Sequence, residues 1–377
     1  MSFKSTTASR RRVFEIAIIC ALPLEARAVK ALFETQPTNE ENIKYDYGTG
    51  ADADFNKSRA DQNAYTIGRI GHHDVVLVHM PGIGEISAAA VAADLKHSFE
   101  GIKLALVVGI CGGLPGSANG NQPEENRRKL MLGDVVVGKQ VIQYDFGRQY
   151  PDGFKRKDDP ENSLSRQNPE IRAFVAKLES KREELEKQMW GSLRSAFKFK
   201  LNEGSSTGPL HELRDELMPP TYWHKHHNLD DCRDKKCRND HGVCEEARGS
   251  SCEQLRCDNN QIFTLGRGEP KQKPDIHFGT IASGNTVMRS GEERDKLAAK
   301  EKQSIIAFDM EGAGVWDYLP CVIVKGVCDY ADSHKNKKWQ EYAAMTAAAC
   351  TKVILDQWPG IHPQQSLENQ ASFNPKN

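Results

Sequence analysis

The feature that most constrains the fold is a repeated alternation of short β-branched runs with helix-forming stretches. Residues 13–20 (VFEIAIIC) form one such run, and residues 104–108 (LALVV) form another. Short runs that are apolar throughout are typical of strands buried on both faces. Between them, the Ala-rich residues 86–99 follow a Pro-Gly turn and predict a helix. This alternation predicts an α/β domain with a largely parallel or mixed central sheet.

The other expected elements continue this pattern. Residues 65–69 and 74–80 predict a hairpin around Gly71, and residues 339–355 predict a helix with one apolar side. Further strands are expected at residues 133–137, 139–144, 276–283, 305–308 and 322–327.

The pattern breaks in the middle of the chain. Residues 151–273 are charged and poor in β-branched residues, and we interpret them as a polar, Cys-rich insert. Within the insert, residues 169–190 have helical spacing and many Glu/Lys pairs, which predicts a solvated helix. We therefore expect a single domain built from residues 13–150 and 274–358, with flexible tails at residues 1–12 and 359–377.

Charge and hydropathy exclude several classes of protein. Lys and Arg total 51 against 52 for Asp and Glu, so the net charge of −1 gives no reason to expect nucleic acid or an anionic membrane as partner. No apolar run reaches the roughly 18 residues that would span a bilayer. The polar, basic residues 1–12 make a poor secretory signal. With cysteines scattered through apolar segments, these features predict a reduced, cytoplasmic protein.

Five of the ten cysteines crowd one stretch of the insert. Their chemistry would suit zinc, with several histidines nearby, but their spacing is not the usual pair of C-x2-C knuckles. A flexible insert with free thiols is the favoured interpretation, and a structural zinc is the alternative. The five are Cys232, Cys237, Cys244, Cys252 and Cys257.

Carboxylates and glycine turns follow several of the predicted strands. Glu25 comes after the first strand, Glu311 after residues 305–308, and Asp329 after residues 322–327. In open α/β sheets, ligands bind outside the carboxyl ends of the strands. Each residue alone would be explained as a helix cap or a turn. Their convergence on one rim predicts a ligand site there.

The same segments carry a family resemblance. The motifs, in chain order, are MPGIGEISAA at residues 80–89, VVGICGG at 107–113, LGDVVVG at 132–138, ASGNTVM at 282–288, AFDMEGAGVWD at 307–317 and GVCDYAD at 326–332. Together they resemble the nucleoside phosphorylase / nucleosidase superfamily, and most closely its fungal purine nucleoside phosphorylase-like domains. The resemblance implies a three-layer α/β sandwich with a twisted, mixed, barrel-like central sheet. It also implies homo-oligomers, dimers or larger, and no cofactor.

The resemblance implies a role for each carboxylate. Members of the superfamily cleave the N-glycosidic bond through a cationic ribosyl transition state, and Asp329 matches the aspartate that protonates purine N7. Glu311 matches the carboxylate that binds the ribose hydroxyls, and Met310 would pack against the ribose. Two residues match the segment that lines the base pocket, Asn285 and Val287. The backbone at Gly82 and Gly109 would approach the ligand closely.

The loop after the first strand bears on the choice between phosphorolysis and hydrolysis. Phosphorylases of the superfamily place an arginine there, whereas this chain has Glu25, as the hydrolytic methylthioadenosine nucleosidases do. A carboxylate is unsuited to phosphate but suited to activating water. Two departures remain, because Ile110 replaces a serine of both branches and Lys325 stands where the nucleosidases have an arginine. Arg27 lies close in sequence and leaves a phosphate site open.

These observations predict a purine nucleoside hydrolase in which Asp329 is the acid, Glu25 activates water and Glu311 binds ribose. A purine nucleoside phosphorylase that gives ribose 1-phosphate is one alternative, and a nucleoside-sensing module without turnover is the other. In each case the expected partner is a small purine nucleoside.

Overall fold

The computed structural model describes residues 14–34, 57–58, 60–115, 129–159, 161, 163–196, 213–239, 242–264, 273–301 and 304–359. The tail expected at residues 1–12 lies outside the described residues, as does the one expected at residues 359–377 apart from Pro359. Among the described helices, none is long and apolar enough to cross a membrane.

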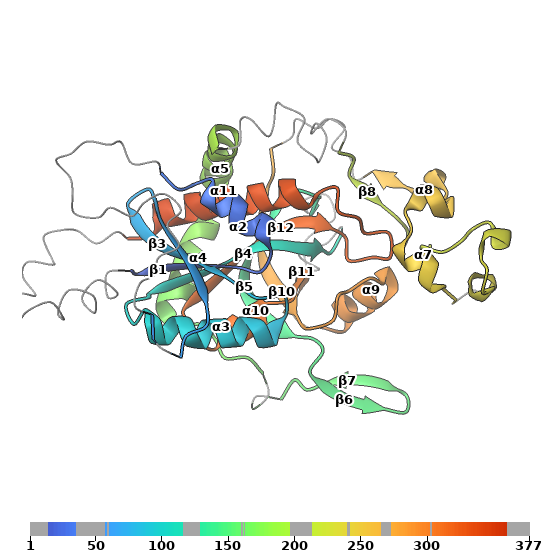
Figure 1. The fold of residues 1–377 in the computed structure, drawn as a ribbon, viewed down its shortest axis with the longest axis horizontal. Helices are drawn as coiled ribbons and strands as arrows, with labels where there is room; N and C mark the ends of the chain where they lie inside the picture. The colour runs from blue at the N-terminus through green and yellow to red at the C-terminus, as the bar shows by residue number, and fades with distance from the viewer. Residues whose placement is uncertain are drawn as a thin grey trace, which may run out of the picture.

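An eight-stranded mixed sheet forms the centre of the molecule (Figure 1). Its order is β11-β10-β5-β12-β4-β1-β3-β2, and an additional antiparallel pairing of β11 with β4 curls one part of the sheet into a barrel. The predicted α/β fold with a mixed, barrel-like sheet is confirmed. The strands are β1 (Ile16–Cys20), β2 (Ala64–Ile70), β3 (His73–His79), β4 (Leu104–Gly113), β5 (Val135–Gln143), β10 (Ile276–Ser283), β11 (Ile305–Asp309) and β12 (Cys321–Asp329).

Strand β4 is longer than the sequence predicted. It was expected to end at Val108 but runs to Gly113, because its glycines allow close neighbours on both sides. A Cβ at Gly113 would lie 2.7 Å from Cγ1 of Val327, and one at Gly112 would lie 2.9 Å from Cβ of Ala331. The glycine-rich residues 109–113 are therefore part of a strand, and they pack closely against β11 and β12. Similarly, β5 joins into one strand the two segments expected on either side of Gly138.

Helices cover both faces of the sheet, giving the three expected layers (Figure 1). On one face, α11 (Gln340–Gln357) packs with α2 (Pro23–Lys30) over β4 and β12. On the other, α3 (Glu85–Ser98) packs against the short α10 (Gly312–Trp316). Helix α11 was expected to be apolar on one side only, but it is buried all round from Tyr342 to Thr351.

Two helices of the predicted insert belong to the core. Residues 169–190 were expected to form one solvated helix, but they form α4 (Pro169–Ser180) and most of α5 (Arg182–Ala196). The apolar side chains of both helices pack into the core beneath α11. The charged residues lie on the opposite, outward sides of the helices. The buried side chains are Ile171, Phe174, Val175, Leu178, Leu185, Met189 and Leu193. The insert's boundaries, 151–273, stay a prediction.

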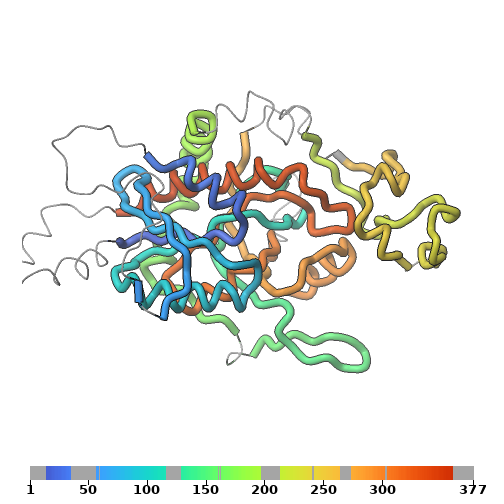
Figure 2. Tube along the Cα trace, in the orientation of Figure 1, coloured from blue at the N-terminus to red at the C-terminus, as the bar shows by residue number. Residues whose placement is uncertain are grey.

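The other described parts are small and lie at the edge of the core. Strands β6 (Gly147–Tyr150) and β7 (Gly153–Arg156) form a hairpin. Helix α9 (Gly291–Lys300) lies between the sheet and a group of short elements at one end of the molecule (Figure 2). We call this group, residues 213–239 and 242–264, the insert lobe. It contains β8 (Glu216–Leu217), β9 (Phe263–Thr264), α7 (Glu245–Gly249), α8 (Cys252–Leu255) and three 3-10 turns, Leu229–Asp231, Lys236–Arg238 and Asn259–Gln261.

Candidate active site

Glu25 is buried at the start of α2, with 3% of its surface exposed. Its Oε2 accepts hydrogen bonds from the backbone N–H groups of Ala21 and Leu22, at 2.9 and 2.8 Å. Its Oε1 accepts one from the backbone N–H of Ile110, at 2.9 Å. Burial raises the pKa of Glu25, and Glu311 adds to this effect while Lys325 opposes it. A carboxylate with a raised pKa is suited to accept a proton near neutral pH.

Lys325 links the carboxylates at the centre of the site. This residue of β12 is 1% exposed, and its Nζ lies 2.7 Å from Oε2 of Glu311 and 3.5 Å from Oδ2 of Asp309. Burial alone would lower the pKa of an ammonium group. The carboxylates of Glu311 and Asp309 outweigh burial and raise the pKa of Lys325. The lysine is thus held charged between two acids.

Asp329 stands at the end of β12 and is 6% exposed. Its Oδ1 accepts a hydrogen bond from the backbone N–H of Ala331, at 2.8 Å. Its Oδ2 lies 3.1 Å from the ammonium of Lys335, which is 21% exposed. The carboxyl therefore has a fixed orientation and an adjacent cation.

Strand β4 connects the two ends of the site. Glu25 bonds to Ile110, and β4 pairs Gly112 with Asp329. A Cβ on Gly109 would lie 2.3 Å from Oε1 of Glu25, so any side chain there would displace the Glu25 carboxyl. The contact points of the two residues on β4, Ile110 and Gly112, are two residues apart, or about 6.6 Å along the strand at a rise of about 3.3 Å per residue.

The expected base-binding residues lie on a neighbouring loop. Asn285 is exposed, and its Oδ1 accepts a hydrogen bond from the backbone N–H of Glu85, at 3.0 Å. Its own backbone N–H donates to Oδ2 of Asp145, at 2.6 Å. Val287 is 45% exposed. Met310, expected near the ribose, is half-buried beside Glu311.

Gly82 and Gly84, in the turn before α3, differ in how strictly their positions require glycine. A Cβ on Gly82 would meet nothing within 4 Å, whereas Gly84 has a φ of +109° and would place a Cβ 3.1 Å from Oδ1 of Asn285. The conformation at the start of α3 therefore depends on Gly84.

Lys335, Glu85 and Gln143 contribute to the site although the sequence analysis did not single them out. Lys335 contacts Asp329, and Glu85 accepts a hydrogen bond from Nε2 of Gln143, at 2.8 Å. Of the three, only Glu85 could have been found from the sequence, because it follows a glycine turn after a strand.

Arg27 is exposed and lies two residues from Glu25, so it faces away from the buried cluster.

The five insert cysteines fall into two groups. Cys252 and Cys257 lie beside His224, whereas the other three gather around a separate point. The first group borders a cavity of about 960 Å³, which Lys335 also lines.

The sequence of the core matches a known family. Residues 15–186 match the sequence model of the phosphorylase superfamily. This part of the chain carries the phosphorylase-superfamily signature. The resemblance predicted from the motifs is thereby confirmed, although those of residues 282–332 lie beyond the matched segment.

Curated relatives match different lengths of the chain. A nucleotide-binding leucine-rich repeat (NLR)-like protein of the fungus Hyaloscypha variabilis is 30% identical over 349 residues, covering 91% of this chain and 29% of that protein. The 5'-methylthioadenosine/S-adenosylhomocysteine nucleosidase of Mycobacterium bovis is 26% identical over 132 residues, covering 35% of this chain and 39% of that protein. The chain therefore spans well under half of each relative's length.

Solved structures support the fold. The 5'-methylthioadenosine/S-adenosylhomocysteine nucleosidase of Colwellia psychrerythraea, in complex with adenine, aligns with a TM-score of 0.51 at 17% identity. The alignment covers 92% of this chain and 97% of that one. This likeness concerns the architecture of the α/β core.

Proposed function

We propose that this protein is a nucleosidase that hydrolyses purine nucleosides to the free base and ribose. The observation that carries the proposal is Glu25, a buried carboxyl held by three backbone N–H groups at the position where phosphorylases of the superfamily bind phosphate. The charge of its surroundings and its remaining hydrogen-bonding capacity favour hydrolysis.

The charge of the cluster disfavours phosphate as the nucleophile. Glu25, Asp309 and Glu311 surround a single buried cation, Lys325. Even with one carboxyl protonated, these four groups remain net negative. At about 4 Å, unit charges interact by roughly 4 kcal/mol at an effective dielectric of about 20, so a phosphate dianion would be repelled. Water carries no such penalty.

Glu25 retains the capacity to bind a water molecule. A carboxylate offers about four acceptor positions, and backbone groups occupy three of them. Among the described residues, Oε1 accepts a hydrogen bond only from Ile110, so it has the remaining position. A water held there would lose its proton to Glu25 as it attacks the anomeric carbon.

Asp329 would protonate the leaving purine at N7. As the proton leaves, negative charge develops on Asp329, and Lys335 at 3.1 Å stabilises that charge. The two residues contact β4 two residues apart, at Ile110 and Gly112, so they flank the same stretch of that strand. With the two carboxyls side by side in this way, Glu25 can act on water while Asp329 acts on the purine.

Glu311 would hold the ribose hydroxyls, with Met310 against the sugar ring. Its Oε2 is engaged by Lys325, which fixes the carboxylate while leaving Oε1 for the ligand. Asn285 and Val287 would border the base from the exposed loop. The name of the mycobacterial relative adds 5'-methylthioadenosine to the purine nucleosides that we propose as substrates.

We also propose that the protein acts as a homo-oligomer. Ile83 and Ile86, on either side of the start of α3, are 48% and 80% exposed. A second copy of the chain would cover these side chains and, with them, the Val287 side of the site. Light scattering coupled to size-exclusion chromatography tests this directly, and a monomer at micromolar concentration contradicts it.

The decisive experiment compares turnover with and without phosphate. The purified protein is incubated with adenosine, inosine, guanosine and 5'-methylthioadenosine, and the sugar product is identified by mass spectrometry. Hydrolysis predicts free sugar in phosphate-free buffer and no sugar 1-phosphate when phosphate is added.

Variants then test the assigned roles. Glu25→Gln and Asp329→Asn are each expected to lower kcat by at least about 100-fold, the usual contribution of a general base or acid. Asp158→Asn, at an exposed carboxylate of the β7 connection, is the matched control. Turnover only with phosphate contradicts hydrolysis, and binding of nucleoside without turnover by the folded parent protein indicates a sensing module.

A further inference from the structure

The insert lobe has very little apolar material to hold it together. Its buried cluster consists largely of cysteines, together with Ala247 and Leu255. Its described helices are one or two turns long, and its cysteines are free thiols. Segments of this size with so small a core usually depend on disulfides or a metal for stability. The lobe therefore requires a cross-link that packing does not supply.

His224 is prepared to bind a metal through one nitrogen. Its Nε2 lies 2.8 Å from the carbonyl oxygen of Ser250, and as the N–H donor in that bond it leaves Nδ1 with a free lone pair. Metal-binding histidines almost always donate their second nitrogen in this way. Nδ1 faces two sulfur atoms, Sγ of Cys252 at 3.6 Å and Sγ of Cys257 at 3.7 Å.

These distances match the edges of a zinc tetrahedron. With Zn–S of about 2.3 Å and Zn–N of about 2.0–2.1 Å, a sulfur and a nitrogen ligand lie about 3.6 Å apart. Local structure sets the spacing, because α8 begins at Cys252 and Arg256 adopts a left-handed conformation with a φ of 56°. The backbone N–H of Cys257 then bonds to the carbonyl of Cys252, at 2.9 Å.

The core supplies a fourth side chain. His334, in the loop between β12 and α11, is 9% exposed, and its Nε2 has no hydrogen-bond partner among the described residues. Its Nδ1 lies 3.4 Å from Oγ of Ser333. One ligand atom each from His224, Cys257 and His334 lies within 4.8 Å of the other two. An unpaired nitrogen buried this deeply is costly unless a ligand satisfies it.

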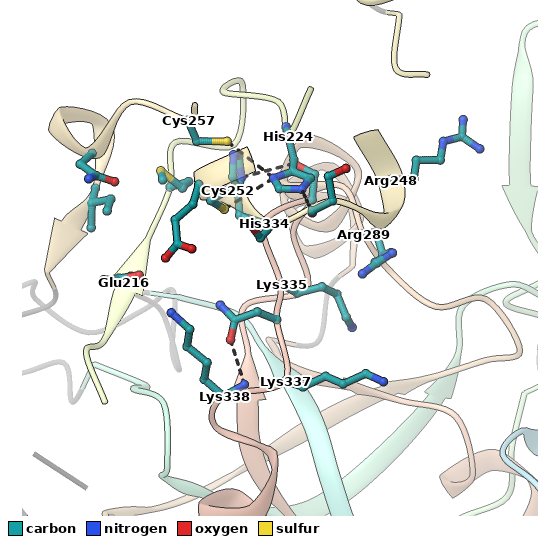
Figure 3. A pocket seen from close by; sticks show the side chains of 18 of the residues that line it. Glu216, His224, Arg248, Cys252, Cys257, Arg289, His334, Lys335, Lys337 and Lys338 are labelled. Atoms are coloured by element: carbon teal, nitrogen blue, oxygen red, sulfur yellow. Dashed lines mark hydrogen bonds between the residues drawn. The ribbon is translucent and has the colours of Figure 1, made fainter. Parts of the chain in front are cut away.

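We propose that His224, Cys252, Cys257 and His334 bind one zinc ion that fastens the insert lobe to the core. Figure 3 shows both cysteine sulfurs facing one edge of the His224 imidazole, with His334 beneath them. Two thiolates and two imidazoles form a closed set of four, which is typical of structural zinc. Because His334 is five residues from Asp329, the ion would also anchor the loop that carries Lys335.

The three remaining cysteines form a separate group. Ligand atoms of Cys232, Cys237 and Cys244 lie within 4.8 Å of one another. Zinc at this group would add to the total in the parent and in folded variants of the first site, so the difference in zinc, not the total, reports on the first site. A comparison of metal content between the parent and variants of the first site therefore isolates that site.

The test measures zinc per chain in untagged protein purified from zinc-supplemented culture. We expect the double variant Cys252→Ser, Cys257→Ser to contain about one zinc ion per chain less than the parent. Cys350→Ala, which removes a buried thiol in α11, is the control and should match the parent. Equal zinc in parent and double variant overturns the proposal.

A second variant covers the possibility that the double variant misfolds. His334→Ala keeps three ligands, and we expect its zinc affinity to fall at least about 10-fold, since even outer-shell changes cost 10–100-fold. The measurement is competition with a chromophoric chelator. Cobalt(II) loaded into the parent should show the absorption of a tetrahedral thiolate site, which His334→Ala should alter. Unchanged affinity, or a Cys252–Cys257 disulfide in the parent found by mass spectrometry, also overturns the proposal.

Discussion

The ammonium of Lys325 lies 2.7 Å from Oε2 of Glu311, with 1% and 7% of the two side chains exposed. A buried pair of this kind gains little net stability, because both ions have lost their hydration. Removing one partner, however, leaves the other charge uncompensated. The pair therefore fixes the position of Glu311 and makes the site dependent on Lys325.

Replacing Lys325 with methionine should destabilise the fold strongly. The change leaves the carboxyls of Glu25, Asp309 and Glu311 without their shared cation, and breaking a buried pair typically costs about 3–5 kcal/mol. Urea denaturation measures the difference in free energy of unfolding. Lys139→Met is the control, because its ion pair with Glu179 is exposed and should be worth less than about 1 kcal/mol. Equal losses in both variants would contradict the central role of Lys325.

The pH dependence of hydrolysis should reflect Glu25. As the base, Glu25 must be ionised, and burial raises its pKa. Activity is therefore expected to rise with pH through a midpoint above about 4.3, the ordinary value for glutamate. The residual activity of Glu25→Gln should lack this acidic limb. A limb that persists in the variant would assign it to another group.

The raised pKa of Glu25 makes the protein less stable as pH rises, whereas it makes activity increase with pH. Because the folded state of Glu25 binds a proton more tightly than the unfolded state, its contribution is present below the unfolded pKa and is lost as pH rises through the folded pKa. Comparing urea midpoints of the parent and Glu25→Gln across this range should show a smaller decline in the variant. A parallel decline in both proteins would refute the effect.

Removing the cation beside Asp329 should impair proton transfer. In Lys335→Met, the carboxylate that forms at Asp329 loses its 3.1 Å partner, so kcat should fall about 10–100-fold with a smaller change in KM. Lys335→Arg should recover part of the loss. Lys352→Met, on α11, is the control for removing a lysine. An increase in KM at constant kcat would show instead that Lys335 binds substrate.

A methyl group at Gly109 should displace Glu25. The Cβ of alanine would lie 2.3 Å from Oε1, so the carboxyl must move away from Ile110. We expect a loss of about 1–3 kcal/mol in stability and a drop in kcat approaching about 100-fold. Gly191→Ala is the control, because its Cβ would meet nothing within 4 Å and alanine favours a helix. Activity at the parental level in Gly109→Ala would argue against Glu25 as the base.

The sequence predicted the sheet well because buried strands are local patterns. Runs such as residues 276–283 and 305–308 became β10 and β11 within one residue. The prediction was wrong where apolar residues were diluted by charge. In α4 and α5 the outward side chains are charged, so the average composition concealed a buried face that α11 covers. The glycines at residues 109–113 were interpreted as a turn, but they belong to β4, where close neighbours leave little room for side chains.

The placement of Glu25, Glu311 and Asp329 after strands, and the family motifs around them, are determined by the sequence itself. Only the tertiary structure decided which side chains meet: Lys325 lies between two acids, Lys335 contacts Asp329, and His334 lies beside His224 and Cys257 of the insert lobe. The contact of His334 joins segments far apart along the chain, whereas the two lysine contacts join the ends of neighbouring elements that the sheet brings together. Local periodicity records whether a side chain is buried, but the identity of its partner depends on how strands and loops are brought together in space.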